Sequence, residues 1–243
     1  MKPDNNNCGL PKWKRTLDAC VIVLATPGLL LLAAVLVVII RAVSNGPVLF
    51  RQERIGYKGR LFTCLKFRTM YCGSDNTDHH GYLRSLVHAD VPMTKMDAHG
   101  DPRIIPFGKI MRASGLDELP QIINVLQGEM SLVGPRPCLT CEVEKFLPWQ
   151  RERFDAVPGL TGLWQVNGKN QLTFTQMVQL DIRYARTKNL WLDLKILFKT
   201  IPVLVKQLSA VKTKIAVPLN HHRRTQPVVP VCPPSQKTET SIC

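Results

Sequence analysis

Residues 101–137 read DPRIIPFGKIMRASGLDELPQIINVLQGEMSLVGPRP, a stretch that combines one apolar helical pattern with charged residues and rigid Pro and Gly positions. Four apolar residues recur at helical spacing before Gly128, and they predict a short buried helix: Leu119, Ile122, Ile123 and Leu126. Proline lacks an N–H and is tolerated where helical donors are unpaired, so Pro120 places the helix start within a few residues of Asp117. Asp117 and Glu118 therefore lie at this start, and Asp117 is a candidate cap.

Cations surround this acidic pair in the sequence: Arg103, Lys109, Arg112 and Arg136. Acidic residues in a first helical turn often do no more than complement the helix dipole. The cations favour a different interpretation, because Arg, Lys and free N–H groups at a helix start attract anions. A carboxylate beside them can hold Mg²⁺ or attack phosphorus. The stretch therefore indicates phosphate chemistry, with Lys109 and Arg112 on one helix face and Arg136 held between two prolines.

A long uncharged run lies near the N-terminus, at residues 19–40. Its 22 residues would reach about 33 Å as a helix, which is close to the thickness of the hydrocarbon layer of a membrane. Membrane insertion is therefore favoured over a buried core helix. Pro27 interrupts the run and predicts a kink, because it removes one helical hydrogen bond.

Basic residues flank both ends of this run: Lys12, Lys14 and Arg15 before it, and Arg41, Arg51 and Arg54 after it. Basic flanks stay in the cytoplasm, so the pattern favours a helix that enters the membrane, breaks at Pro27 and returns on the same side. Asp18 lies three residues after Arg15. It is either the partner of Arg15 in an ion pair at the membrane interface, setting depth and angle, or only a flanking charge.

Residues 47–70 show an alternating pattern that is typical of two strands joined at Tyr57-Lys58-Gly59. This predicts a β-hairpin. Alternation puts Lys66 and Arg68 side by side on one face of the second strand. We favour support of a phosphate or active site for these two cations over a solvated strand end.

The composition limits the class of partner without selecting one. The 243 residues carry a formal net charge of +14, which favours nucleic acid, an anionic lipid surface or phosphorylated substrates. Eight irregularly spaced cysteines and no cleavable signal pattern point to a reducing environment. Cys138 and Cys141 form a lone CxxC, for which a metal or redox role is not favoured.

The remaining segments are less specific. The polar segment 71–100 contains four histidines: His79, His80, His88 and His99. Their spacing is irregular, so we expect a mobile loop with a short helix near residues 82–88 and not a metal site. A core helix is predicted from Phe174, Met177, Leu180 and Tyr184. Residues 190–208 show an amphipathic helical pattern whose apolar stripe is Trp191, Leu194, Leu197, Ile201 and Leu204 or Leu208. Such a helix would lie in the lipid interface or pack on the core.

Three longer motifs make a specific resemblance. These are GPVLFRQERIGYKGRLFTCLKFRTM, GLDELPQIINVLQGEMSLVGPRP and VPGLTGLWQVNGKN. In this order and spacing, they make residues 12–208 similar to the bacterial sugar transferase family, the monotopic polyprenyl-phosphate phosphoglycosyl transferases. The resemblance implies a helix-rich α+β fold, with a re-entrant membrane helix at 12–43 and a cytoplasmic catalytic domain at 44–215. Residues 1–11 and 216–243 are expected to be a flexible lead-in and a disordered tail.

The resemblance also implies a reaction. A phosphosugar would pass from a UDP-sugar to polyprenyl phosphate on the cytoplasmic face of the bacterial inner membrane, at the first step of glycan assembly. Asp117 would be the nucleophile, and Glu118 would position substrate or join Asp117 in holding Mg²⁺. Candidate nucleotide-sugar contacts are Thr161, Gln165, Asn167 and Lys169, and Asp181 is a further candidate for facing the site.

Partners expected on this basis are the two substrates, membrane lipid and no nucleic acid, with downstream glycosyltransferases or a second copy as further candidates. The alternative is a membrane-anchored basic binding or scaffold protein without catalysis. Charge alone supports the alternative equally well. It does not explain why Asp117 and Glu118 lie among the cations.

Overall fold

The computed structural model describes residues 9–71, 101–168 and 171–215. The four histidines between residues 71 and 100, Lys169 and the predicted tail lie outside these ranges. Along the described chain the elements are α1 (Lys12–Val43), β1 (Leu49–Ile55), η1 (Tyr57–Gly59), β2 (Leu61–Phe67), α3 (Gly108–Ser114), η3 (Leu116–Glu118), α4 (Gln121–Gln127), β3 (Ser131–Val133), α5 (Thr140–Val143), η4 (Pro148–Asp155), β4 (Gly159–Thr161), α6 (Leu163–Val166), α7 (Phe174–Thr187) and α8 (Leu190–Ile215). The expected helix-rich α+β composition is confirmed.

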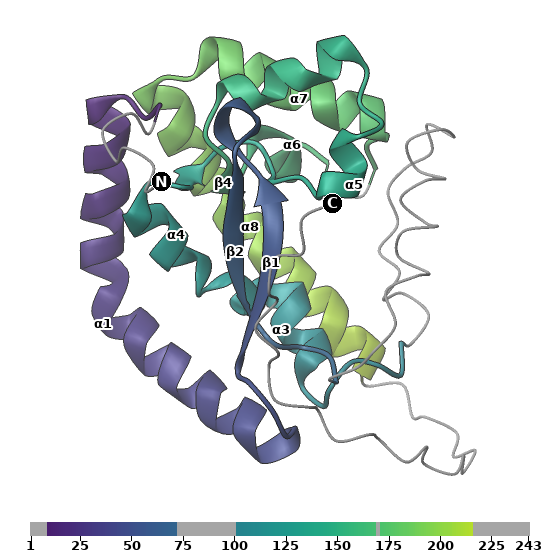
Figure 1. The fold of residues 1–243 in the computed structure, drawn as a ribbon. Helices are drawn as coiled ribbons and strands as arrows, with labels where there is room; N and C mark the ends of the chain where they lie inside the picture. The colour runs from purple at the N-terminus through teal and green to yellow at the C-terminus, as the bar shows by residue number, and fades with distance from the viewer. Residues whose placement is uncertain (1–8, 72–100, 169–170, 216–243) are drawn as a thin grey trace, which may run out of the picture.

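The strands form two small sheets (Figure 1). β1 and β2 make the predicted antiparallel hairpin, in which Leu49 lies opposite Phe67. Their connection is the predicted turn, and its Lys58 adopts a left-handed conformation with φ 53°. β3 and β4 pair in parallel, with Ser131 opposite Gly159. The second pair joins two segments that the sequence places on either side of α5 and η4.

α1 is one continuous helix that contains Pro27 and bends in its middle portion (Figure 1). The hydroxyl of Thr26 donates a hydrogen bond of 2.7 Å to the Ile22 carbonyl one turn earlier. Such a bond beside a proline favours bending. α1 is also long and apolar enough to cross a membrane. Only 11% of its most apolar 18-residue stretch is buried inside the protein.

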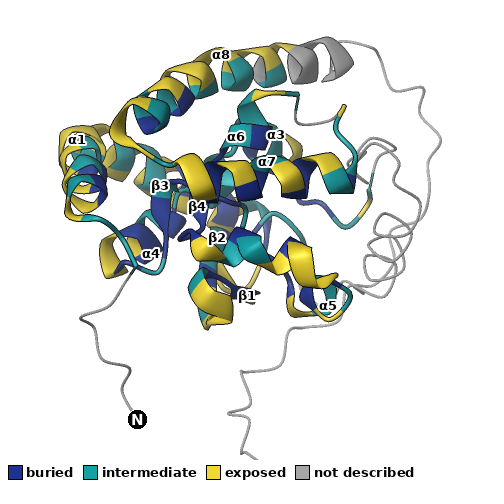
Figure 2. Cartoon of the chain, turned by 90° about the horizontal axis from the view of Figure 1, so that it is seen from above, coloured by how far each residue is buried: buried dark blue, intermediate teal, exposed yellow. Residues whose placement is uncertain are grey.

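The two ends of α1 pack against the same domain. Near the N-terminal end Ile22 contacts a cluster with Val125 and Met130. Near the other end Leu36 and Ile40 are completely enclosed by residues of the hairpin and α3. Between these anchor points the apolar side chains are exposed, and Figure 2 shows this outer surface of α1: Val23, Leu24, Leu30, Leu31, Val35 and Val38.

The domain core lies between the hairpin, α6 and α7 (Figure 2). α7 buries Phe174, Met177 and Tyr184, three of the four residues expected to form its apolar stripe, and Leu180 is partly buried. Thr173 caps this helix by accepting a hydrogen bond from the Gln176 N–H. α7 is therefore the internal helix that the sequence predicted.

The apolar stripe expected on α8 lies only partly against the domain: Leu197 packs on the core, whereas Trp191 and Ile201 are exposed. Asp193 and Ile196 are buried, whereas Trp191 is 77% exposed and Phe198 is 71% exposed. Asp193 accepts hydrogen bonds from Lys14 and Tyr184 inside the domain. The face of α8 that packs on the domain therefore includes this polar residue. The side chains left outside form a second apolar row: Leu190, Trp191, Phe198, Ile201 and Val205.

The helix expected after Asp117 is also oriented differently. α4 ends at Gly128 as predicted, but Ile123 is 44% exposed and Leu126 is 50% exposed. Its buried residues are Gln121, Asn124 and Val125. Asp117 is not the cap, because it lies within η3 and Pro120 occupies the capping position of α4.

Candidate active site

The acidic pair lies on η3, a single 3-10 turn between α3 and α4. α3 ends at Gly115, whose left-handed conformation (φ 74°) turns the chain while its N–H donates to the Met111 carbonyl. Asp117 and Glu118 follow directly and are half-buried. Their carboxylates are therefore held by a short, tight turn and remain partly accessible.

Glu118 faces the hairpin. Its Oε1 accepts a hydrogen bond of 2.8 Å from Nζ of Lys66, and both side chains are partly exposed. Lys66 lies on β2 opposite Phe50 of β1. The structure thus brings together a carboxylate and a cation that are 52 positions apart in the sequence.

Asn124 fixes the distance between α4 and β2. Its Oδ1 accepts from the Leu65 N–H at 3.2 Å, and its Nδ2 donates to the Thr63 carbonyl at 2.8 Å. The amide thus pairs with the free edge of β2 as a neighbouring strand would. The sequence analysis missed this residue, although an amide within an apolar helix pattern was the available signal.

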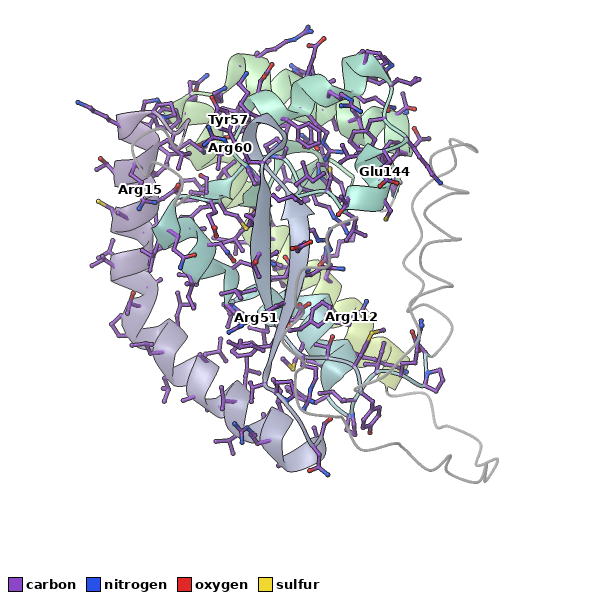
Figure 3. All side chains as sticks on the ribbon, viewed as in Figure 1. Arg15, Arg51, Tyr57, Arg60, Arg112 and Glu144 are labelled. Atoms are coloured by element: carbon purple, nitrogen blue, oxygen red, sulfur yellow. The ribbon has the colours of Figure 1, made fainter. Side chains whose placement is uncertain are left out.

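Asp101 is paired with Arg103 and lies near the charge of Arg112 on α3. Arg103 donates from Nε to Oδ1 at 2.9 Å and from Nη2 to Oδ2 at 2.8 Å. These bonds, together with the charge of Arg112, hold the pKa of Asp101 below its usual value. Figure 3 shows Arg112 on α3, beside the half of the hairpin that carries Arg51. Lys109 is exposed on the same short helix.

Arg136 lies near Cys64 in the middle of β2. Burial raises the pKa of the Cys64 thiol, the charges of Lys66, Arg54 and Arg136 lower it, and the charge of Glu118 raises it. These groups therefore lie around one position in the middle of β2. Arg136 itself is half-buried. Of the predicted cations, Lys66 and Arg136 thus lie with Glu118 around Cys64.

Two glycine-containing segments cross at the base of this region. A Cβ on Gly134 would lie 2.3 Å from the Val157 carbonyl oxygen, and one on Gly159 would lie 2.0 Å from the Gly134 nitrogen. Only glycine allows this approach. The crossing brings the VGPRP segment against VPGLTG, two motifs that the sequence analysis had singled out separately.

The candidates for nucleotide-sugar contact follow this crossing. Thr161 is buried, and its Oγ1 lies 2.8 Å from Oγ1 of Thr200 on α8. Asn167 donates from Nδ2 to the Leu163 carbonyl at 2.9 Å. Oε1 of Gln165 is buried without a hydrogen-bond partner in the described part of the chain. Of these three, Gln165 retains a buried acceptor that a ligand could satisfy.

Two predicted site residues have structural partners instead. Arg68 is buried and donates to the Ser44 carbonyl at 2.8 Å and the Asn45 carbonyl at 2.7 Å, which fixes the chain at the end of α1. Asp181 is fully buried and accepts from Arg153 at 2.5 Å. The prediction that Asp181 faces a substrate is therefore wrong in this geometry, because α7 turns its side chain into the core.

The charged residues at the start of α1 also bond to the domain. Lys14 is buried and donates to Tyr184 Oη at 2.9 Å, and it pairs with Asp193. Asp18 accepts from the Leu132 N–H at 3.2 Å. These residues were expected at the membrane surface, but they anchor α1 to the protein.

Arg15 is part of the same anchor. It donates to the carbonyls of Val125 and Leu126 at the end of α4, where helix carbonyls lack helical partners and attract cations. Figure 3 shows Arg15 on α1 beside this helix. The expected ion pair between Arg15 and Asp18 is therefore wrong, because each side chain has a different partner.

The acidic pair fits a magnesium ion that is completed by substrate. Mg²⁺ is commonly held by one or two carboxylates together with phosphate oxygens and water. In the described ranges there is no group of three or more His, Cys, Asp or Glu side chains that could enclose a metal. Asp117 and Glu118 are adjacent carboxylates in a partly accessible turn, which is the kind of donor set that Mg²⁺ shares with a bound phosphate.

Comparison with known proteins gives a consistent result. Residues 10–207 match a family described as "Bacterial sugar transferase". The chain is 40% identical over 200 residues to a UDP-galactose-lipid carrier transferase of Erwinia amylovora, covering 80% of this chain and 40% of that protein. It is 42% identical over 203 residues to a UDP-glucose:undecaprenyl-phosphate glucose-1-phosphate transferase of Caulobacter vibrioides, covering 79% and 69%.

A shorter relative is also similar. The exopolysaccharide production protein ExoY of Sinorhizobium fredii is 35% identical over 191 residues, which cover 79% of this chain and 84% of that protein. The chain therefore spans about two-fifths of the Erwinia protein and most of ExoY.

Proposed function

Because the chain belongs to the bacterial sugar transferase family, as its motifs predicted, we propose that it transfers a sugar phosphate from a UDP-sugar to polyprenyl phosphate. The products are polyprenyl-diphosphate-sugar and UMP. One structural observation carries the proposal: the partly accessible Asp117–Glu118 turn lies against Lys66, and Arg136 lies with Lys66 and Glu118 around Cys64. The names of the relatives support the same substrate classes.

The first step is attack by Asp117. One of its carboxylate oxygens forms a bond to the phosphorus that carries the sugar, and the bond from that phosphorus to the UMP oxygen breaks. UMP leaves with the electron pair of the broken bond. A carboxylate is ionised at neutral pH, so this nucleophile needs no general base.

The second step restores the enzyme. An oxygen of the polyprenyl phosphate attacks the same phosphorus, and the bond to Asp117 breaks. The sugar phosphate is now joined to the lipid phosphate as a diphosphate. The carboxylate of Asp117 returns to its initial state, so the two substrates react one after the other at one residue.

Charge is the main obstacle to both steps, because an anionic nucleophile approaches an anionic phosphate. Lys66, Arg112 and Arg136 offset this repulsion and stabilise charge that develops on the phosphate oxygens. Mg²⁺ held by Asp117 and Glu118 would add a Lewis acid for the same oxygens. Glu118, held by Lys66, keeps the turn oriented toward the substrate phosphates.

The lipid substrate calls for a membrane-embedded helix, and α1 is proposed to enter and leave the inner membrane on its cytoplasmic face. Both of its ends pack on one domain, which supports a re-entrant path over a full span. The exposed middle of α1 and the outer apolar row of α8 would contact lipid. The exposed Lys195 and Lys199 on α8 suit anionic headgroups.

The activity is tested with the purified full chain in detergent. With UDP-sugar and Mg²⁺ alone, UMP should appear in a burst near the enzyme concentration, and polyprenyl phosphate should then allow continuous release. The named relatives differ in using galactose and glucose, so a panel of UDP-sugars is required. UMP release only after lipid addition would replace the covalent route by direct attack, and no release from any donor would favour the binding or scaffold role.

The topology is tested with single cysteines placed at Lys2 and Asn45, in a chain whose eight native cysteines are replaced by serine. Both should react with a membrane-impermeant reagent from the cytoplasmic side of inverted vesicles. Reaction of the two positions from opposite sides would exclude the re-entrant path. Pro27→Leu should shift part of the population toward a full span, because the helix loses the cause of its bend.

A further inference from the structure

The segment 134–138 that carries Arg136 is held more tightly than an ordinary loop. Pro135 and Pro137 fix two of its φ angles and remove two N–H donors. The Pro135 carbonyl accepts from the Gly159 N–H at 2.8 Å. The backbone on either side of Arg136 therefore has little freedom to change direction.

Two buried arginines bond to the next two carbonyls. Arg153 on η4 donates from Nη2 to the Arg136 carbonyl at 3.3 Å. Arg54 on β1 donates from Nη1 to the Pro137 carbonyl at 3.1 Å. Both guanidinium groups are almost completely excluded from solvent. Three consecutive carbonyls of this short segment are thus bonded to three different parts of the fold.

The two arginines are themselves fixed by side-chain partners. Arg153 pairs with Asp181 at 2.5 Å and lies 5.7 Å from the centre of the Phe146 ring. Arg54 donates from Nε and Nη2 to Oε1 of Gln52, at 3.1 and 2.7 Å. Each guanidinium therefore has a defined orientation before it meets the segment that carries Arg136.

A purely structural account explains this arrangement poorly. The buried carbonyls of this segment need hydrogen-bond partners, but a neighbouring N–H could satisfy them without burying a charge. Burying a guanidinium costs desolvation that its partners repay only in part, so such groups are weak stabilising elements. Their rigid donor geometry is well suited to holding another group in place.

We propose that Arg153 and Arg54 are positioning residues for Arg136. They hold its backbone so that its guanidinium meets the phosphate of the UDP-sugar without reorganisation. Asp181, which the sequence suggests as a substrate contact, then acts indirectly: it orients Arg153, which in turn holds the backbone of Arg136. This inference rests on the proposed function, because it assigns Arg136 to the transferred phosphate.

A double-mutant cycle on the full chain tests the proposal. Arg153→Met keeps the length of the side chain and removes its donors, and Arg136→Ala removes the group to be positioned. We expect Arg136→Ala to lower kcat/KM for UMP release by about 10²-fold. Arg153→Met should lower it by about 10-fold or more, because a misplaced group loses its alignment. In the Arg136→Ala background, Arg153→Met should have less than about a threefold effect.

Asp181→Asn provides a milder change if Arg153→Met does not fold. It keeps an acceptor beside Arg153 and removes the charge, so its effect should also depend on Arg136. Arg54→Met tests the second contact in the same way. Effects of these variants that multiply fully with that of Arg136→Ala would overturn the proposal.

Asp193→Asn is the matched control, since it breaks a different buried ion pair, with Lys14 on α1. Its thermal unfolding should shift downward as for Asp181→Asn, while any effect on kcat/KM should be equal in both Arg136 backgrounds. Coupling of the Asp193 change to Arg136 would also overturn the assignment, because it would show that general loosening mimics positioning. If the wild-type chain released no UMP, this result would contradict the proposed function, and the inference that rests on it would fail as well.

Discussion

The two charged segments near β2 are built in opposite ways. η3 carries Asp117 and Glu118, has no buried residue and follows a helix that ends at Gly115. The segment 134–138 carries Arg136 and is buried at each of its other positions, with successive carbonyls bonded to distant parts of the chain. One segment is partly accessible, and the other is buried and held at successive carbonyls.

The difference corresponds to two requirements of the proposed chemistry. A nucleophile must approach a substrate atom, exchange a bond and release it, so it needs access from solvent or membrane. A cation that stabilises developing charge acts best when it is already in place, because reorganisation would consume the interaction energy. The fold therefore places the proposed nucleophile on a short turn and the proposed stabilising cation on a segment held at successive carbonyls.

The largest effect is expected where the accessible segment supplies chemistry. Asp117→Asn keeps the shape of the side chain and removes its negative charge, so the UMP burst should vanish and turnover should fall at least about 10⁴-fold. The unfolding temperature should change little because Asp117 is half-buried. Near-normal turnover by this variant, measured as UMP release, would show that Asp117 is not the nucleophile.

The next largest effect is on stability, and it compares Gly159, which packs against the segment 134–138, with Gly115, which precedes η3. A Cβ at Gly159 would collide with the Gly134 nitrogen at 2.0 Å, whereas at Gly115 the nearest atom is 3.9 Å away. Gly159→Ala should therefore lower the free energy of unfolding by about 3 kcal/mol. Gly115→Ala should lower it by only about 1 kcal/mol, the cost of a left-handed alanine. Denaturant titration measures both, and equal losses would contradict the contrast in rigidity.

A smaller effect tests what ties the accessible segment to the hairpin. Asn124→Leu removes the partners of the Leu65 N–H and the Thr63 carbonyl, so unfolding should become easier by about 2 kcal/mol. The adjacent exposed Ile123→Ala should change it by less than about 0.5 kcal/mol. If the two substitutions cost the same in denaturant titration, Asn124 would not be the element that holds α4 to β2.

The smallest effect on stability is expected for Lys66→Met. The Lys66–Glu118 pair is partly exposed, so its loss should cost less than about 1 kcal/mol. Turnover should nevertheless fall about tenfold, because a cation beside the acidic pair is lost. Lys58→Met is the control: it breaks the exposed pair with Asp155 at the hairpin turn and should leave turnover unchanged. Equal turnover of the two variants would place Lys66 outside the site.

Local patterns in the sequence were sufficient for several elements. The β-hairpin, the long apolar helix with Pro27 and the glycine that caps α4, Gly128, all depend on residues close together in the chain. Backbone propensity, proline geometry and glycine turns act over this range, so the sequence alone predicts them. The motifs likewise identified the family.

The tertiary structure decided which face of each helix is buried and which charges meet. Lys14 pairs with Asp193, 179 positions later, and Asp181 pairs with Arg153 in the core, although the sequence suggested membrane and substrate contacts. α4 and α8 bury Asn124 and Asp193 while Leu126 and Trp191 are exposed. Periodicity defines the spacing of a stripe along a helix, but the side that packs depends on partners supplied by distant segments. The physical reason is that burying a polar group is favourable only when those partners complete its hydrogen bonds.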